Sequence, residues 1–420
     1  MDKLTTHIQY GSFVLLALMI PFSIAGATGA IFLGMLAWAA ALVAVPSSRS
    51  TARLIGKDPL FLAGILLVIS ALPSLYLSEN FTRAFHDWKS YWLLIIYLLV
   101  AFQVQDGTRR RTLFWILFAS LLLSCTVALI QHYGGLDLVL FTIQPKHRPG
   151  GTLYPMTFAG ILYQTILLTF AVLLRERKPS PAAVILAAGA LMQFVVLLFT
   201  MTRGAYLALV GGLLVMLLLV RNKRALAGVV VLLALLAAFL AYKPSDLDRS
   251  LSVPGLVQAP ADRNVSTRLV LWDISMEMFK RHPIFGVGMG DYSIETEKLL
   301  AERKVTTTVD SHNIYLQTLA TRGLIGFIPF AAFWLILLRE LFEAKRRLPP
   351  HSFGRHLVIG AIGATAALLI GALTENNIDD SEVFIAYLFI IGLARSTVLG
   401  DLSGTADAPK PAPENIKPLD

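Results

Sequence analysis

Long apolar segments alternate with short polar ones along the whole chain, and this alternation predicts helices that cross a membrane. A helix needs about 20 mostly apolar residues to span the hydrocarbon core of a bilayer. We identify twelve candidate spans, at 11–26, 28–45, 59–77, 91–104, 112–132, 154–174, 182–199, 204–220, 225–242, 323–338, 357–374 and 381–398. The first, second and fourth are short, which suits tilted, broken or partly interfacial helices. The pattern predicts an all-α polytopic membrane protein.

The predicted spans divide the chain into four parts. Residues 1–242 hold nine spans, residues 243–322 form one long polar loop, and residues 323–398 hold three more spans. Residues 399–420 are rich in Pro, Ala and Asp, a composition typical of a disordered tail. The sequence shows no repeat at solenoid periods and no matching halves of the transporter kind.

The composition agrees with a membrane protein. Hydrophobic residues make up 56% of the chain and charged residues only 15%, whereas soluble domains carry about 25% charged residues. The only cysteine, Cys125, lies in an apolar span, which excludes an internal disulfide and a cysteine-based metal site. No small-residue cleavage site follows the short N-terminus, so we expect the first span to be retained.

The positive charge of the chain is unevenly distributed, and this predicts its orientation. The net charge is +9, and the basic residues concentrate in the connections after the even-numbered spans, as in Arg109–Arg110–Arg111. The opposite short connections contain only Arg83, Lys89, Lys146, Arg148 and Arg203. By the positive-inside rule both termini are predicted to be cytoplasmic and residues 243–322 periplasmic. Nucleic-acid binding is not expected, because no basic arm, zinc spacing or RNA-binding motif is present.

Three short outside connections contain cations that are candidates for binding an anionic substrate. Arg83 and Lys89 lie in one that also suits a plain solvated loop with an interfacial Trp. Arg148 precedes a Gly150–Gly151 turn, where backbone can approach a ligand but which is also an ordinary turn. Arg203 lies in a very tight connection between two apolar runs, where a guanidinium needs a phosphate or carboxylate. We favour a lipid-bound phosphate for Arg203 over snorkelling to lipid headgroups.

The long loop predicts an amphipathic helix that begins at Ser266 or Thr267 and runs to about Arg281. One face collects apolar residues at spacings of three and four, which suits a helix on the membrane surface; they are Leu269, Trp272, Met276 and Phe279. Arg268 lies at its start, where an anion could bind. The following GVGMGDY has no preceding strand, so we expect a tight turn returning the chain to the membrane rather than a nucleotide loop.

His312 is the outside histidine that the sequence places at the start of a helix, with Asp310 or Ser311 as the predicted cap. A lone histidine is more often structural than catalytic, but the positive end of a helix keeps an imidazole neutral, as a general base for a sugar hydroxyl requires. A ring that only orients the acceptor is the alternative role. Arg322 follows on the same helix. One acidic cluster lies between the last two spans, and we expect it to hold the arginines rather than a metal ion; it consists of Glu375, Asp379 and Asp380.

Three motifs taken together resemble the O-antigen ligase/polymerase superfamily. They are TMTRGAYLAL, the Arg268–Trp272 helix followed by HPIFGVGMGDY, and DSHNIYLQTLATRGLIG. The resemblance implies a GT-C-like membrane scaffold and a metal-independent, inverting transfer of a glycan from undecaprenyl pyrophosphate, with no cofactor. It further implies that His312 activates the acceptor hydroxyl, that Arg203 and Arg268 neutralise the pyrophosphate, and that Arg322 is a further candidate for that role. Arg148, Arg83 and Lys89 remain additional candidates for binding substrate.

The resemblance leaves the acceptor open. A ligase that uses lipid A–core is favoured, because the chain is compact, with one dominant loop and no appended soluble domain. A polymerase or related oligosaccharyltransferase is the alternative. A transporter of lipid-linked glycans is a more distant one, since the predicted spans carry almost no ionisable residue at mid-depth. A second copy of the chain is a further candidate partner.

Overall fold

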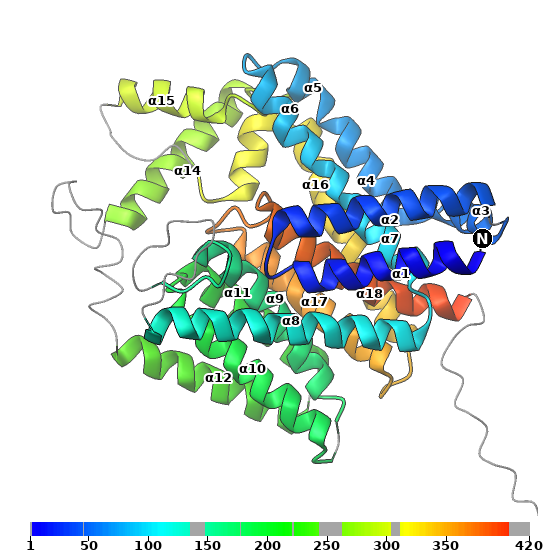
Figure 1. Cartoon of the computed structure of the whole chain (residues 1–420). Helices are drawn as coiled ribbons and strands as arrows, with labels where there is room; N and C mark the ends of the chain where they lie inside the picture. The colour runs from blue at the N-terminus through cyan, green and yellow to red at the C-terminus, as the bar shows by residue number, and fades with distance from the viewer. Residues whose placement is uncertain are drawn as a thin grey trace, which may run out of the picture.

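The computed structural model describes residues 2–44, 46–134, 148–176, 178–220, 222–242, 263–303 and 311–402. These residues form helices joined by turns, with no strand among them (Figure 1). The predicted all-α fold is confirmed. Lys146, Asp310 and residues 403–420 of the predicted tail lie outside the described residues.

The first half of the chain forms α1 (Asp2–Met19), α2 (Ile24–Ala44), α3 (Pro46–Ile55), α4 (Pro59–Ser70), α5 (Leu72–Tyr76), α6 (Phe81–Lys89), the 3₁₀ helix η1 (Ser90–Leu94), α7 (Ile95–Gln103), α8 (Gly107–Gly134), α9 (Pro155–Leu173) and α10 (Pro181–Phe199). The second half forms α11 (Arg203–Val220), α12 (Lys223–Tyr242), α14 (Arg263–Arg281), α15 (Tyr292–Glu302), α16 (Ile314–Arg347), α17 (Phe353–Gly371) and α18 (Ser381–Leu402).

Ten helical segments in the described part of the chain are long and apolar enough to cross a membrane. They correspond to ten of the twelve predicted spans, so a polytopic helical membrane protein is confirmed. The other two predictions meet shorter helices. The first apolar helix runs over Leu4–Met19, seven residues earlier than predicted, and 91–104 is divided between η1 and the nine-residue α7.

The helices α9, α17 and α18 make the centre of the bundle. In the most apolar stretch of each, 83%, 72% and 89% of the residues are buried. Small residues let these helices approach closely, as interfaces between membrane helices commonly do. A Cβ on Gly160 would lie 2.5 Å from Val383 of α18, and one on Gly360 would lie 2.9 Å from the Leu168 backbone of α9. By contrast, α12 is 17% buried and lies at the edge of the bundle (Figure 1).

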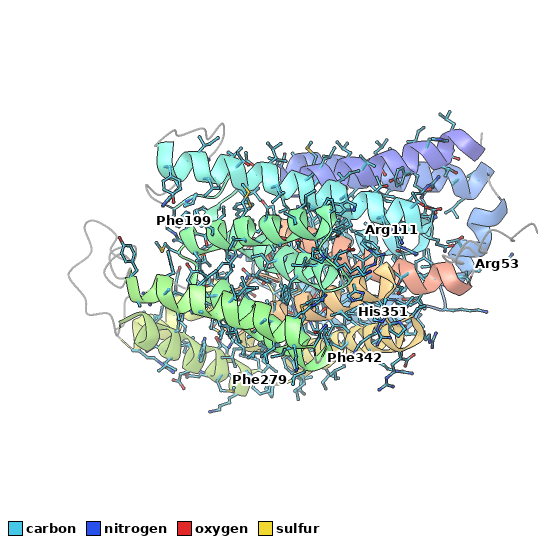
Figure 2. The ribbon with its side chains drawn as sticks, turned by 90° about the horizontal axis from the view of Figure 1, so that it is seen from below. Arg53, Arg111, Phe199, Phe279, Phe342 and His351 are labelled. Carbon is cyan, nitrogen blue, oxygen red and sulfur yellow. The ribbon has the colours of Figure 1, made fainter. Side chains whose placement is uncertain are left out.

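The two ends of the bundle differ in the residues they present. Arg53, Arg111 and His351 lie at the end that also carries the N-terminus (Figure 2). Phe199 lies at the opposite end (Figure 2). We call the latter the site end, because the turn after Phe199 leads directly to Arg203.

The helix α16 is broken at Gly323, which has φ 57° and ψ −161°. The segment after α14 crosses α16 at this break and takes up the backbone groups that the break leaves unpaired. Val287 N–H donates to Ala320 O at 2.9 Å, and Leu324 N–H donates to Pro283 O at 2.9 Å. A Cβ on Gly323 would lie 2.4 Å from the carbonyl carbon of Ile284. The HPIFGVG segment is therefore hydrogen-bonded to both sides of the break in α16 and leads into α15. The prediction that it returns the chain directly to the membrane is wrong.

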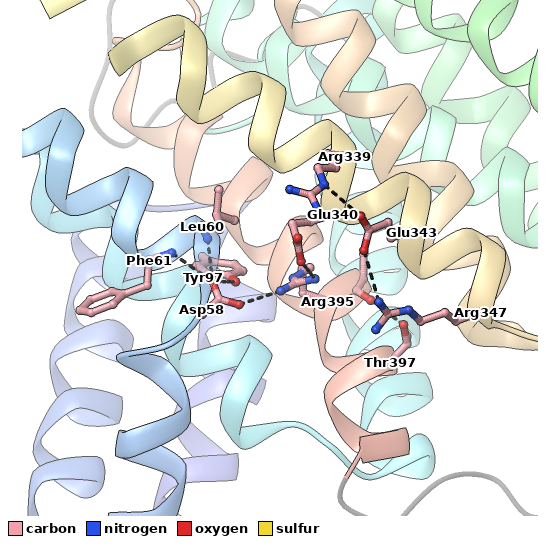
Figure 3. A network of polar contacts seen from close by, with 11 residues as sticks. Asp58, Leu60, Phe61, Tyr97, Arg339, Glu340, Glu343, Arg347, Arg395 and Thr397 are labelled. Atoms are coloured by element: carbon pink, nitrogen blue, oxygen red, sulfur yellow. Dashed lines mark hydrogen bonds and ion pairs between the residues drawn. The ribbon is translucent and has the colours of Figure 1, made fainter. Parts of the chain in front are cut away.

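A buried ionic cluster near the opposite end joins α18 to α4 and α16 (Figure 3). Arg395 of α18 donates to Asp58 at 2.7 Å and to Glu340 at 2.6 Å. Asp58 also caps α4 by accepting from Leu60 N–H and Phe61 N–H at 3.0 Å each. The Arg395 and Asp58 side chains are 6% and 4% exposed. The cluster lies in the apolar body that the sequence had suggested was nearly free of charge.

Removing Arg395 should destabilise the protein strongly. Arg395→Met leaves the Asp58 and Glu340 carboxylates buried without a cation, which typically costs about 3–5 kcal/mol. Thermal unfolding of the purified protein in detergent measures the effect. The control is Arg347→Met, because Arg347 is 60% exposed in its pair with Glu343 and exposed pairs contribute little. Equal midpoints for the two variants would contradict the structural role of the cluster.

Gly323→Ala should also lower the midpoint of thermal unfolding in detergent. The added methyl group would collide with the Ile284 backbone, and the φ and ψ angles of Gly323 are accessible essentially to glycine alone. We expect a loss of about 3 kcal/mol or more. Gly29→Ala is the matched control, since nothing lies within 4 Å of its added Cβ. A Gly323→Ala variant as stable as wild type would show that the segment crossing α16 can move to accommodate a methyl group without loss of stability.

Candidate functional site

The carboxylate of Glu375 lies between two of the predicted functional side chains at the site end. Arg268 Nη2 lies 3.3 Å from Glu375 Oε1, and His312 Nδ1 lies 3.7 Å from Glu375 Oε2. The Glu375 side chain is 9% exposed, whereas Arg268 and His312 are 35% and 29% exposed. The buried carboxylate thus holds a cation and an imidazole whose other faces remain open. This agrees with the expectation that the acidic cluster holds the arginines.

Arg203 belongs to the same site through the start of α11. A Cβ on the next residue, Gly204, would lie 2.6 Å from Glu375 Cγ and 3.1 Å from Thr374 Oγ1. Only the absence of a side chain there lets the first turn of α11 approach Glu375 this closely. Arg203 is exposed. Its position at a helix N-terminus favours an anion rather than a cation, so an anionic ligand would relieve the conflict.

Arg148 supports the turn that precedes Arg203. Its Nε–H donates to Thr200 O at 2.8 Å, and its Nη2 donates to Thr202 Oγ1 at 3.3 Å. The turn contains Met201, which has φ 53°. Arg148 is therefore placed to fix the turn and remains half-buried beside the site.

His312 precedes α16 in a strained conformation, with φ 48°. In the described residues, Met201 and His312 are the two non-glycine residues with positive φ, and both lie at this site. Strained backbone is held only where its surroundings enforce it, and it concentrates at functional sites. The predicted cap is wrong: Asn313 caps α16, accepting from Tyr315 N–H and Leu316 N–H at 3.1 Å each. Ser311 instead accepts from Asn313 N–H at 3.2 Å.

The helix α14 carries Arg268 and begins at Arg263, three residues before the predicted start. Its buried face packs against α15 and α16 and is formed by Leu271, Ile274 and Met278. The predicted surface face is only partly buried, and Leu269 is 56% exposed. Trp272 departs from that prediction, because its Nε1–H donates to Ser311 O at 3.1 Å. This bond ties α14 to the residue that precedes His312.

The remaining predicted cations lie apart from this cluster. Arg322 is at the break of α16, eight residues after Ile314, or about 12 Å along the helix axis. Arg83 lies on α6, and Arg83 and Arg322 line one shared cavity. Lys89 is exposed at the end of α6 and does not line that cavity. Among the described residues, no group of three or more His, Cys, Asp or Glu side chains is arranged to hold a metal ion.

Glu375 is the residue whose position the sequence indicated least directly. It was visible as part of an acidic cluster in an outside connection, but the other members have different roles. Asp380 caps α18 by accepting from Glu382 N–H and Val383 N–H, and it also accepts from Thr157 at 2.6 Å. Spacing alone could not distinguish these roles, because the partners of each carboxylate come from distant parts of the chain.

The fold and the site together define a multi-pass helical membrane protein with a histidine, a carboxylate and arginines gathered at one end of the bundle. Residues 183–331 match the sequence model of the family described as O-antigen ligase. The match confirms the resemblance over these residues. It begins in α10, ends in α16 and contains Arg203, Arg268 and His312, whereas Glu375 and Arg148 lie outside it.

An uncharacterized protein of Haemophilus influenzae (strain ATCC 51907 / DSM 11121 / KW20 / Rd) is 32% identical over 97 residues. These residues make up 22% of this chain and 24% of that protein, so the chain matches about a quarter of the relative's length.

Replacing Glu375 should weaken the contacts that gather the site. Glu375→Gln keeps the size of the side chain but removes the charge that Arg268 and His312 share. Because Arg268 is partly exposed, we expect a loss of only about 1 kcal/mol. Thermal unfolding in detergent measures it, with the exposed Glu79→Gln as control. A Glu375→Gln variant indistinguishable from the control would show that the carboxylate does not organise the site.

Proposed function

We propose that the protein is an O-antigen ligase, a glycosyltransferase that moves a glycan from undecaprenyl pyrophosphate to a lipid A–core acceptor. The observation that carries the proposal is the placement of His312 and Arg268 on the buried carboxylate of Glu375, with the start of α11 at Arg203 and Gly204 beside it. Arg203, Arg268 and His312 all lie in the segment that matches the O-antigen ligase family. An oligosaccharyltransferase or polymerase of the same family would use the same site with another acceptor.

In the proposed reaction, the acceptor hydroxyl attacks the anomeric carbon of the donor sugar. The new C–O bond forms as the bond to the pyrophosphate breaks, which inverts the anomeric configuration. The hydroxyl proton passes to His312 as general base. Glu375 lies near Nδ1 of the imidazole, so it orients the ring and stabilises the imidazolium that forms, leaving Nε2 for the acceptor.

The pyrophosphate leaves with the bonding electrons and gains negative charge as the bond breaks. Arg203 and Arg268 are fixed cations that stabilise this charge without reorganising. Arg148 supports Arg203 through the Thr200–Thr202 turn. Because guanidinium groups supply the neutralising charge, the mechanism uses no divalent cation, and transfer in EDTA is expected.

The proposed location is the bacterial inner membrane, with both termini cytoplasmic and the site end facing the periplasm. Support comes from the basic residues at the opposite end, where Figure 2 shows Arg53 and Arg111, since positive residues remain on the cytoplasmic side. Nucleotide sugars are not available on the periplasmic side, so a donor there must already be activated on a lipid. A site at the end of the bundle suits such a substrate.

The decisive experiment uses purified full-length protein in detergent with undecaprenyl-pyrophosphate-linked glycan and lipid A–core, followed by gel shift of the acceptor. His312→Ala should lower transfer by about 100-fold or more, since a general base contributes roughly 10²–10⁴. Arg268→Met and Arg203→Ala should lower it comparably. Arg281→Met is the matched control, because Arg281 lies at the other end of α14 in an exposed pair with Glu277.

The outcomes separate the candidate functions. A shifted acceptor that disappears in the His312 variant supports the ligase. Lengthening of the donor glycan without the acceptor assigns the site to a polymerase. If folded wild type does neither, or if all variants equal wild type, the transferase proposal fails and transport of the lipid-linked glycan becomes the next assay.

A further inference from the structure

A cavity of about 420 Å³ lies next to the catalytic cluster, against another part of α16. One face of α16 lines it over more than two turns, with Ile314, Gln317, Thr318, Thr321 and Arg322 at the helical spacing of three and four. Gln317 marks the border with the catalytic cluster, because Ser311 Oγ donates to Gln317 Oε1 at 3.0 Å. The cavity is therefore adjacent to His312 but distinct from the Arg203–Arg268 side of the site.

The cavity walls carry both hydrogen-bond donors and acceptors. Asp87 comes from α6, and Asp379 and Asp380 come from the connection between α17 and α18. Asn376 Nδ2 donates to Gln317 Oε1 at 2.8 Å on the side towards the catalytic cluster. Carboxylates and amides of this kind match sugar hydroxyls, which both donate and accept. The deeper wall is aromatic and is formed by Phe330, Phe333, Trp334 and Phe384.

An apolar groove of about 190 Å³ adjoins the cavity and shares Tyr91, Leu94 and Phe333 with it. The rest of the groove is mostly one side of α4, including Gly64, Ile65 and Ile69. Ile65 and Ile69 are 39% and 55% exposed in the segment Pro59–Tyr76, which is long and apolar enough to cross a membrane. The groove thus opens towards lipid, and its continuity with the cavity suits a molecule with a polar head and a hydrocarbon chain.

Arg322 lies where the polar cavity meets the apolar groove. It donates to the hydroxyl of Tyr91, and its guanidinium carbon lies 5.5 Å from the centre of the Tyr91 ring. Among the described residues, the buried Arg322 Nε has no hydrogen-bond partner. A buried N–H without an acceptor is costly, and a phosphate oxygen would satisfy it with a charge-assisted bond. Lipid A carries its phosphates on the same sugars that carry its acyl chains, so a phosphate bound to Arg322 would have a sugar on the cavity side and a chain on the groove side.

We propose that the cavity and the groove bind the acceptor glycolipid, with a sugar in the cavity, a phosphate on Arg322 and one hydrocarbon chain in the groove. The proposal rests on the proposed function, in which Arg203 and Arg268 take the pyrophosphate of the donor. The acceptor then reaches His312 from the Gln317 side while the donor occupies the Arg268 side. An inverting displacement requires such opposite approaches.

The test is equilibrium binding to the purified full-length protein in detergent, measured separately for bis-phosphorylated lipid A and for undecaprenyl pyrophosphate. Arg322→Met removes the phosphate contact. Gly64→Leu fills the groove with little strain, since the nearest atom to an added Cβ is Leu94 Cδ1 at 3.5 Å. Each variant should weaken lipid A binding about tenfold, the equivalent of roughly two buried methylene groups or one charge-assisted hydrogen bond, and leave undecaprenyl pyrophosphate unchanged.

Two controls make the result specific. Gly29→Leu adds the same side chain to a glycine with nothing within 4 Å of its added Cβ, and it should change neither affinity. Arg268→Met should weaken undecaprenyl pyrophosphate and spare lipid A. Loss of undecaprenyl pyrophosphate binding in the Gly64 variant would assign the groove to the donor and overturn the proposal, as would unchanged lipid A binding in folded Arg322 and Gly64 variants. If the wild-type protein still transfers glycan to lipid A–core, either of these binding results would overturn the acceptor site but not the proposed function.

Discussion

The break of α16 at Gly323 is the constraint on which the site end of the molecule depends. A helix that turns there leaves backbone N–H and C=O groups without partners in the helix, and such groups need other hydrogen-bond partners when they are buried. The segment from Pro283 to Gly288 supplies the missing partners and is thereby fixed in place. Because this segment connects α14 to α15, the same contacts fix Arg268 relative to His312. Arg322 lies at the break itself, so one backbone crossing determines the positions of three of the candidate cations and bases.

Buried carboxylates pair with positively charged side chains at both ends of the bundle, but the two clusters differ in how far these side chains are exposed. Near the end opposite the site, Asp58 and Glu340 enclose Arg395 on two sides, and the side chains are almost fully buried. Such a closed cluster can stabilise the packing of α4, α16 and α18 but leaves no room for a substrate. At the site end, Glu375 is equally buried, yet its partners Arg268 and His312 remain about one-third exposed. Positive charge held on one side and open on the other is what an anionic ligand requires.

The sequence predicted the helical membrane fold and ten of its spans, because long apolar segments depend only on local composition. It also singled out Arg203, Arg268 and His312, which lie together in the structure. It could not predict that Arg322 lies elsewhere, since that depends on where α16 breaks and on the segment that crosses it. Asn313 was missed as the cap because Ser311, two residues earlier, is an equally good capping residue. The buried partners of Arg395, Asp58 at the start of α4 and Glu340 on α16, come from two distant parts of the chain, and no local pattern joins them.

The strained residues indicate how the site is held ready for its ligands. Met201 lies in the turn that leads to Arg203, His312 precedes α16, and both residues have positive φ. Each is fixed by side-chain bonds to its neighbourhood: Arg148 holds the Met201 turn, and Trp272 holds Ser311 next to His312. If packing alone were selected, glycine at either position would remove the strain. Retaining a larger residue in strained backbone is understandable for His312 if its ring must lie beside Glu375 and between two substrates. The hydrogen bonds of Arg148 and Trp272 to the neighbouring backbone then offset the free-energy cost of the strained residues.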